Sequence, residues 1–328
     1  MSYFPDGKQI ISGSFDETIR RWDLRKGKEI KKDREVYEKL QAVGVSRDGR
    51  WVVIAGGNGI KVSEVETGIV RTFDEGYSGC IDISADSTLL VGASFGVRIW
   101  NLDTAELLAG PFNIGGEIPE AVRFSEDSRK LAVSSHKAKD RHLEVWEVQT
   151  QKLDVQKSIH TALGYLHVPI FWTTKDKSIV AAFTSLDDYS KIYEYDASTL
   201  KTVGAPFKHT SRILGLALSS DCVLLASSSY RTIKLWAFES RQLLASVDVE
   251  SIYTLLLSPD SRQLAYTSFH DSKIRICDIQ ANILASIEST SKSVHPDLLN
   301  VSDPALSFIH TIPFFIILVR CNTSHCAP

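Results

Sequence analysis

The sequence predicts an all-β fold, a seven-bladed β-propeller of four-stranded antiparallel blades, because two short motifs each recur seven times along the chain. The first motif is a run of mostly apolar residues that ends in Trp-Asp or a variant of it. The second is an apolar strand closed by a tight turn that contains Asp. The two motifs alternate along the chain, so one copy of each marks one blade.

The Trp-Asp motif sets the length of the repeat. In chain order its copies are IRRWDL, IKVSEV, VRIWNL, LEVWEV, IYEYDA, IKLWAF and IRICDI. The Trp position is held by Trp22, Ser63, Trp100, Trp146, Tyr195, Trp236 and Cys277, at successive spacings of 41, 37, 46, 49, 41 and 41 residues. A period of this length, made of short strands, is typical of propeller blades.

The Asp turns give the same count independently. Their copies are FPDG, SRDG, SADS, SEDS, TKDK, SSDC and SPDS, with the carboxylates Asp6, Asp48, Asp86, Asp127, Asp176, Asp221 and Asp260. Asp beside Gly or Ser favours a tight turn, because its side chain accepts hydrogen bonds from nearby backbone and Gly tolerates a positive φ. Two motifs that agree seven times predict seven blades.

Four strands can be assigned directly in the sixth repeat. They are ILGLAL (213–218), VLLASS (223–228), TIKLW (232–236) and QLLASV (242–247). Val, Ile, Leu and Ala dominate the two inner strands, as expected when blades stack face to face and strands are buried on both sides. We expect no long amphipathic helix.

Composition limits the kinds of function. The chain has 328 residues, of which 43% are hydrophobic and 23% charged, enough for one large core. Its formal net charge is −3, and a slightly acidic chain does not have the basic excess that binds phosphate backbones. We therefore expect no nucleic-acid partner.

The cysteines and the N-terminus bear on compartment and cofactors. The five cysteines form no CxxC pair, and no Cys/His set has zinc-ligand spacing, so we expect no metal and no cofactor. Reduced, buried thiols and the absence of an apolar leader in residues 1–9 favour a cytoplasmic or nuclear protein.

The two ends depart from the repeat. Residues 1–287 are expected to form the propeller, with an innermost first strand shortened to residues 1–4, as if clipped at the N-terminus. Residues 288–328 are expected to form a non-repeat tail, for which disorder is the favoured interpretation. The alternatives are an extra strand that pairs with the incomplete first blade and a membrane or targeting element, although the apolar run 314–319 is too short to span a bilayer.

These motifs resemble the WD-repeat (beta-transducin-type) family over residues 1–287, and the last two repeats are similar to those of fungal WD-repeat proteins. The resemblance implies that a His, a Ser, an Asp and the Trp pin each blade through buried hydrogen bonds. It assigns structural roles to Ser14, Asp16 and Trp22 in the first repeat, to His209, Ser228 and Trp236 in the sixth, to Asp271 in the seventh, and to Trp100 and Trp146.

Catalysis is the less favoured class of function. His209 lies beside Ser211 and Arg212, but the sequence has no nucleophile elbow, and the family pattern already explains this histidine. The pair Asp187 and Asp188 lies in a polar turn, where solvated carboxylates are the simpler interpretation. We expect no catalytic residues.

Partner binding is expected on the rim that carries the connections between second and third strands. The fourth repeat has a longer connection there, SSHKAKDRHL (134–143). Tyr, Phe and Arg are frequent at interaction hot spots. The candidates are Tyr230, Arg231, Phe269, His270, Lys137, Arg141, Phe15 and Tyr189.

The resemblance implies a non-catalytic scaffold or adaptor that binds other proteins or peptides, as a monomer within a larger complex and without membrane contact. The alternative is a substrate receptor of a cullin-RING ubiquitin ligase. Residues 10–25 resemble the box of such receptors, with Arg25 reaching the ligase adaptor, although Arg21 stands where that box prefers an aliphatic residue.

Overall fold

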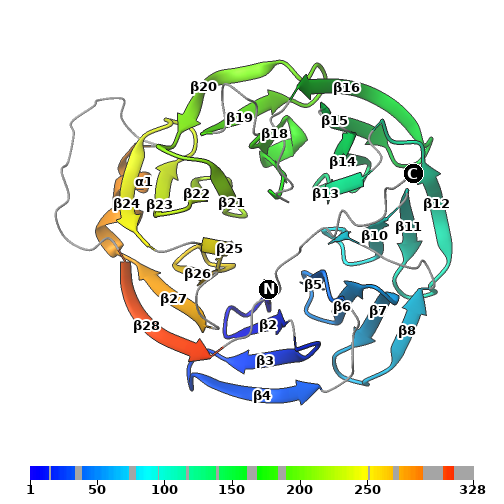
Figure 1. Ribbon diagram of the computed structural model, residues 1–328, viewed down its shortest axis with the longest axis horizontal. Helices are drawn as coiled ribbons and strands as arrows, with labels where there is room; N and C mark the ends of the chain where they lie inside the picture. Colours follow the sequence, from blue (N-terminus) through cyan, green and yellow to red (C-terminus); the bar gives the residue numbers. More distant parts are fainter. Residues whose placement is uncertain are drawn as a thin grey trace, which may run out of the picture.

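The computed structural model is a ring of seven four-stranded antiparallel sheets around a central channel, which confirms the predicted fold class (Figure 1). Each blade consists of four strands that are consecutive in the chain, with the first innermost and the fourth at the circumference. The structure describes residues 1–14, 16–33, 39–73, 79–94, 96–115, 118–137, 140–160, 168–183, 190–249, 252–268, 273–290 and 306–313.

The first four blades use strands β1 to β16. Blade 1 contains β1 (Ser2–Tyr3), β2 (Gln9–Gly13), β3 (Ile19–Asp23) and β4 (Lys28–Asp33). Blade 2 contains β5 (Ala42–Val45), β6 (Trp51–Gly56), β7 (Gly59–Glu64) and β8 (Val70–Phe73). Blade 3 contains β9 (Cys80–Ile83), β10 (Leu89–Ala93), β11 (Val97–Asn101) and β12 (Leu107–Phe112). Blade 4 contains β13 (Ile118–Phe124), β14 (Lys130–Lys137), β15 (Asp140–Glu147) and β16 (Lys152–His160).

The remaining three blades use β17 to β28. Blade 5 contains β17 (Phe171–Trp172), the 3₁₀ turn η1 (Thr174–Asp176), β18 (Ser178–Ala181), β19 (Lys191–Asp196) and β20 (Thr202–Lys208). Blade 6 contains β21 (Ile213–Leu218), β22 (Leu224–Ser229), β23 (Thr232–Ala237) and β24 (Leu243–Asp248). Blade 7 contains β25 (Ile252–Leu257), β26 (Gln263–Ser268), β27 (Lys273–Ile279) and β28 (Leu306–Pro313).

Blade 7 is completed from the segment expected to be a tail. Strand β28 pairs antiparallel with β27, with Leu306 opposite Ile279 and Pro313 opposite Lys273. The extra strand that the sequence suggested as an alternative therefore forms, but on the seventh blade and not on the first. The end of the propeller domain at residue 287 stays a prediction.

One α-helix, α1 (Ala281–Thr290), was not expected from the sequence. Its Ile283 is buried in the apolar cluster between blades 6 and 7, and the helix contacts β24. No helix within the described ranges is both long and apolar enough to cross a bilayer.

The core of the described residues is divided among the seven interfaces between blades. Each of the seven apolar clusters draws its residues from two neighbouring blades, for example Trp51 and Val53 of blade 2 with Leu90 and Trp100 of blade 3. Alternation along a strand sends successive side chains to opposite faces, so each inner strand contributes to two interfaces. An isolated blade would expose both faces, and only the closed ring buries them.

Three of the tryptophans in the Trp position pack against the blade that precedes them. Trp100, Trp146 and Trp236 each meet a phenylalanine on the outermost strand of that blade, at ring-centroid distances of 5.6, 5.5 and 5.6 Å, in edge-to-face geometry. Their phenylalanine partners are Phe73, Phe112 and Phe207. Edge-to-face pairs are favourable beyond their buried area. This recurring aromatic partner was missed in the sequence.

The hydrogen bonds of the buried tryptophans correct two of the structural assignments. In blade 6, Trp236 Nε1 donates to Ser227 Oγ at 2.8 Å, and His209 Nε2 lies 2.7 Å from the same oxygen. In blade 1, Trp22 Nε1 donates to Ser12 Oγ at 2.8 Å. Ser227 and Ser12 therefore hold the positions that the sequence assigned to Ser228 and Ser14.

Strand register explains both corrections. Trp236 is paired with Leu225 on the neighbouring strand. Side chains on one face of a strand recur at every second residue, so the next side chain on that face is Ser227. Ser228 faces the other way, and its buried Oγ has no hydrogen-bond partner in the described structure. Ser14 has the correct parity but lies four residues from Ile10, the partner of Trp22. Its Oγ instead accepts from the amide of Asp16, whose carboxylate accepts from Thr18 N.

We predict that Ser227→Ala destabilises the protein by about 2 kcal/mol or more, because two buried polar groups lose their partner. Ser228→Ala is the matched control, and it should change the free energy of unfolding by less than about 0.5 kcal/mol. Urea unfolding measures both. Equal effects of the two substitutions would contradict the assignment of Ser227.

The buried histidine in this network is held neutral. Burial, together with the nearby positive charge of Lys234, lowers the pKa of His209 to about 4. A second N–H at Nδ1 would be buried without a hydrogen-bond partner among the described residues. The unfolded chain therefore takes up a proton that the folded state does not, between about pH 6.5 and pH 4.

Because the folded-state pKa is depressed, His209 should favour the folded state fully above pH 6.5 and progressively less as the pH falls towards 4. We predict that the loss of unfolding free energy between pH 7 and pH 4.5 is smaller by about 2 kcal/mol in His209→Gln than in the parent. His160→Gln, at an exposed histidine, is the control and should lose as much as the parent. Parallel pH profiles for all three proteins would refute a neutral buried His209.

Candidate functional site

The Asp turns all lie at one end of the propeller, which we call the turn face. In five of them a Ser Oγ donates to the Asp two residues later, at 2.5 to 2.8 Å. The same Asp oxygen accepts from the amide two residues further on. These serines and carboxylates are therefore committed to their own turns.

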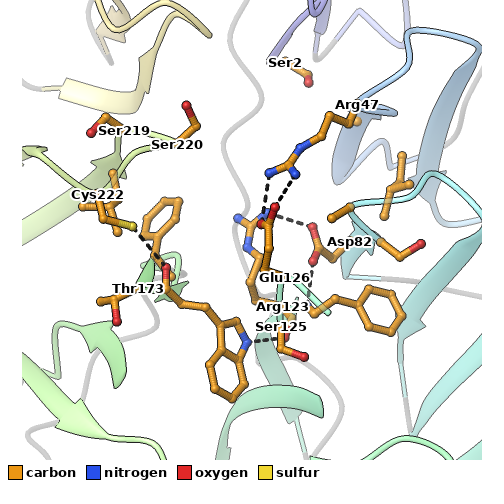
Figure 2. Close-up of a pocket in the computed structure, with 18 of the residues that line it drawn as sticks. Ser2, Arg47, Asp82, Arg123, Ser125, Glu126, Thr173, Ser219, Ser220 and Cys222 are labelled. Carbon is orange, nitrogen blue, oxygen red and sulfur yellow. Dashed lines mark hydrogen bonds and ion pairs between the residues drawn. The ribbon is translucent and has the colours of Figure 1, made fainter. Parts of the chain in front are cut away.

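The central channel opens at the turn face into a cavity of about 570 Å³. The turns of blades 2 to 6 line it, together with Met1, Ser2 and Leu256 (Figure 2). Its wall carries charged side chains, hydroxyl groups and the rings of Phe124, Phe171 and Trp172. Its volume falls within the range of small-molecule sites.

A partly buried ion pair forms one side of the cavity. Arg123 Nη1 lies 2.7 Å from Asp82 Oδ1, and the amide of Phe124 donates to Asp82 Oδ2 at 2.8 Å. The guanidinium also lies over the ring of Phe171 and donates through Nε to the carbonyl of Ile170. Burial raises the pKa of Asp82, although the pair with Arg123 opposes that shift. The pair connects the innermost strands of blades 3, 4 and 5.

A second ion pair crosses the mouth of the cavity. Arg47 of blade 2 donates twice to Glu126 of blade 4, at 2.5 and 3.2 Å, and so passes over blade 3 (Figure 2). Both side chains are more than half exposed, so the pair contributes little to stability. Its role is to place a paired positive and negative charge at the opening.

Asp176 of blade 5 departs from the pattern of the other turns. It occupies the left-handed position of its turn, with φ 55°, where blade 4 has Ser128 and blade 6 has Cys222. Its carboxylate accepts instead from the amides of Glu126 and Asp127 in blade 4, at 2.7 and 3.2 Å. The turn motif TKDK is thus displaced by one residue, and its Asp links two blades.

The described lining of the cavity contains no histidine. Arg47 pairs with Glu126 and Arg123 pairs with Asp82, and the carboxylate of Asp176 accepts from two backbone amides. Nucleophilic catalysis needs a base next to a nucleophile, with an orienting group behind it. In the described part of the chain, no group of three or more His, Cys, Asp or Glu could hold a metal ion.

The opposite end of the propeller, which we call the upper rim, carries the connections between second and third strands. Tyr230 and Arg231 form the tip of the β22–β23 hairpin, and both are exposed, Tyr230 by 48%. Arg212 lies close enough to Tyr230, Arg141 and Glu120 for all three to influence its pKa, which burial lowers. The structure therefore brings candidates from blades 4 and 6 to one region.

The fourth-blade insertion is not the exposed loop expected from the sequence. Strands β14 and β15 continue through it, with His136 opposite Arg141 and Lys137 opposite Asp140. Lys137 is exposed, as expected. Arg141 is only 3% exposed and pairs with Glu120 at 3.0 Å, so it cannot be a direct surface contact. The strand alternation that continues into the insertion turns Arg141 inward.

The structure does not test the remaining rim candidates. Phe15, Tyr189, Phe269 and His270 lie outside the described residues, as do the structural candidate Asp271 and the pair Asp187 and Asp188.

The family profile described as "WD domain, G-beta repeat" matches residues 1–23 and 200–237. These segments span the first three strands of blade 1 and the strands from β20 to β23. Together with the seven-bladed ring, this match supports the WD-repeat β-propeller family.

Two curated proteins are similar to this WD-repeat propeller in sequence. Apoptotic protease-activating factor 1 of Rattus norvegicus is 26% identical over 244 residues, which are 72% of this chain and 18% of that protein. Eukaryotic translation initiation factor 3 subunit I of Bombyx mori is 23% identical over 194 residues, or 56% of this chain and 57% of that protein. The chain thus spans only part of the length of each.

Two solved structures share the fold. Hydrazine synthase of Kuenenia stuttgartiensis has a TM-score of 0.69 at 13% identity and covers 82% of this chain and 91% of its own. The β-propeller domain of Cps50 (Swd1) of Myceliophteria thermophila has a TM-score of 0.66 at 15% identity. The match covers 81% of this chain and 92% of that domain's chain. At these identities the likeness concerns the fold alone.

We predict that Asp176→Gly destabilises this WD-repeat propeller by about 1 to 2 kcal/mol, because glycine keeps the left-handed turn but loses both inter-blade hydrogen bonds. Ser128→Gly, at the equivalent turn position of blade 4, is the matched control and should be neutral or slightly stabilising. Thermal and urea unfolding measure both. A similar loss in the two variants would contradict the linking role of Asp176.

Proposed function

We propose that this WD-repeat propeller is a non-catalytic scaffold that binds other proteins or peptides through its upper rim. The observation that carries the proposal is the exposed pair Tyr230 and Arg231 at the tip of the β22–β23 hairpin. Tyr and Arg are the residue types that most often anchor protein interfaces. The hairpin itself is rigid, since its strands are buried in the stack of blades.

The contrast with the turn face supports the same surface. At the turn face, the recurring geometry of five Ser–Asp pairs uses those polar side chains within their own turns. At the upper rim, Tyr230, Arg231 and Lys208 are exposed. Exposed side chains of these types can contact a partner.

The absence of catalysis is part of the proposal. In support, the described cavity brings together paired charges and hydroxyl groups without a histidine base. The likeness to hydrazine synthase concerns the fold, so it does not favour an enzyme. The three described cysteines, Cys80, Cys222 and Cys277, lie in no disulfide, which supports the proposed cytoplasmic or nuclear location.

A ubiquitin-ligase substrate receptor is the second candidate. Arg25 is exposed beyond the end of β3, where its amide donates to Asp23, as contact with a ligase adaptor would require. Arg21, the departure from the box, lies over the ring of Phe4 at 4.1 Å and so has a structural role. An exposed arginine on a turn has no partner specificity by itself, and the scaffold is the function we favour.

We predict that Tyr230→Ala combined with Arg231→Ala weakens recovery of partners in affinity capture with mass spectrometry. The free energy of unfolding should change by less than about 0.5 kcal/mol, because both side chains are at an exposed tip. The control is Lys8→Ala with Arg129→Ala, two exposed basic residues of the turn face. Partners that survive the rim changes and disappear with the control changes would move the binding surface to the turn face.

A further inference from the structure

Basic side chains gather at the upper end of blade 6. Lys208 ends β20, Arg212 precedes β21, Arg231 is at the β22–β23 tip, and Lys234 follows on β23. The ammonium group of Lys234 donates to the carbonyl of Lys208 at 3.1 Å, which brings these two lysines together. Arg212 lies within electrostatic range of Tyr230, the neighbour of Arg231. Four cationic residues therefore share the surface that carries Tyr230.

Three of these cations form no close ion pair with a described carboxylate, although Asp248 lies opposite Thr232 at the same end of blade 6. In the ranges that the structure describes, Lys208, Arg231 and Lys234 have no carboxylate within 4.0 Å, whereas eleven other charged pairs on the molecule lie within that distance. The local excess stands out because the whole chain has a net charge of −3. The positive charge therefore reflects how residues are arranged on this surface, because the composition of the whole chain is slightly acidic.

The neighbouring blade adds further positive charge. Arg141 and His136 lie 3.0 and 3.1 Å from Glu120 Oε1, and Glu120 is also within electrostatic range of Arg212. Arg141 and Arg212 are close enough for one to lower the pKa of the other. Burial also lowers the pKa of Lys234. The lowered pKa values of Arg212 and Lys234 both show that their positive charges are unfavourable in partly desolvated positions. A negative charge bound beside them would stabilise the charged forms.

We propose that the upper end of blade 6 binds an acidic peptide segment of a protein partner, whose carboxylates pair with Lys208, Arg212, Arg231 and Lys234 while an apolar side chain packs on Tyr230. This inference rests on the proposed scaffold function and names the chemistry of its partner. The exposed tyrosine ring beside the cations supplies the apolar contact that a purely electrostatic surface lacks.

A nucleic acid fits this surface less well. Strong phosphate-backbone binding uses several lysine and arginine contacts spread along the strand. Here the described cations are confined to one blade and its neighbour, on a chain of net charge −3 that repels a long polyanion. A short acidic segment matches the size of the surface better.

The test uses the full chain and a fluorescein-labelled peptide of repeated Glu-Glu-Leu triplets, with Gln-Gln-Leu triplets as the neutral probe. Fluorescence anisotropy should show binding of the acidic probe that weakens as salt rises towards about 0.15 M, and at least about tenfold weaker binding of the neutral probe. Lys208→Glu with Arg231→Glu should weaken binding of the acidic probe by about tenfold or more. The control variant, Lys8→Glu with Arg129→Glu, changes the net charge by the same amount but on the turn face. Its affinity for the acidic probe should stay within about twofold of that of the parent.

Equal losses in the two charge-reversal variants would overturn the proposal, because only net charge would then matter. Tighter binding of a single-stranded DNA oligonucleotide with the same dependence on Lys208 and Arg231 would also overturn it, in favour of a nucleic-acid surface. If Tyr230→Ala with Arg231→Ala abolishes partner capture but the acidic probe does not bind the parent, the scaffold proposal stands and the acidic partner is wrong. If the probe binds as predicted and capture is unchanged, the surface binds acidic peptides but the scaffold proposal fails there.

Discussion

The closed stack of blades is the constraint on which the rest of the structure depends. The inner strands bury apolar side chains on both faces of a blade, so one blade cannot bury its own residues and each interface is completed by a neighbour. Blade 7 receives its fourth strand, β28, from a segment outside the repeat. The closed ring leaves a central channel and two rims, whose loops are free to differ because the stack already provides the stability.

The polar contacts are secondary to that stack, and they vary from blade to blade. Trp22 and Trp236 each donate to a serine on the second strand, but Val133 occupies the equivalent place in blade 4 and cannot accept. There Glu144 accepts from Trp146 Nε1 at 3.0 Å and from the amide of Gly115 at 2.6 Å, and burial raises its pKa. For these three tryptophans the indole N–H has an acceptor, and that acceptor is the residue that the register places within reach.

The two ends of the channel differ in the same physical terms. At the turn face the charges are paired across blades, as in Arg47–Glu126 and Arg123–Asp82, and the Ser–Asp pairs hold their own turns. At the upper rim, Arg141 of blade 4 and Arg212 of blade 6 come together near Glu120. Paired charge stabilises geometry, whereas excess charge beside an exposed tyrosine favours association, so the upper rim is the better candidate for recognition.

The number of blades, the strands of the sixth repeat and the burial of Trp22, Trp100, Trp146 and Trp236 were determined by the sequence alone, because periodic burial on two faces is written into the local pattern of residues. Tertiary structure decided which serine meets Trp236, since a shift of one residue turns a side chain to the other face of the sheet. It also decided that Arg141 is buried, that Asp176 links two blades and that cations of separate repeats converge. Those features depend on register, on a displaced turn and on the spatial neighbourhood of distant segments, none of which a one-dimensional repeat encodes.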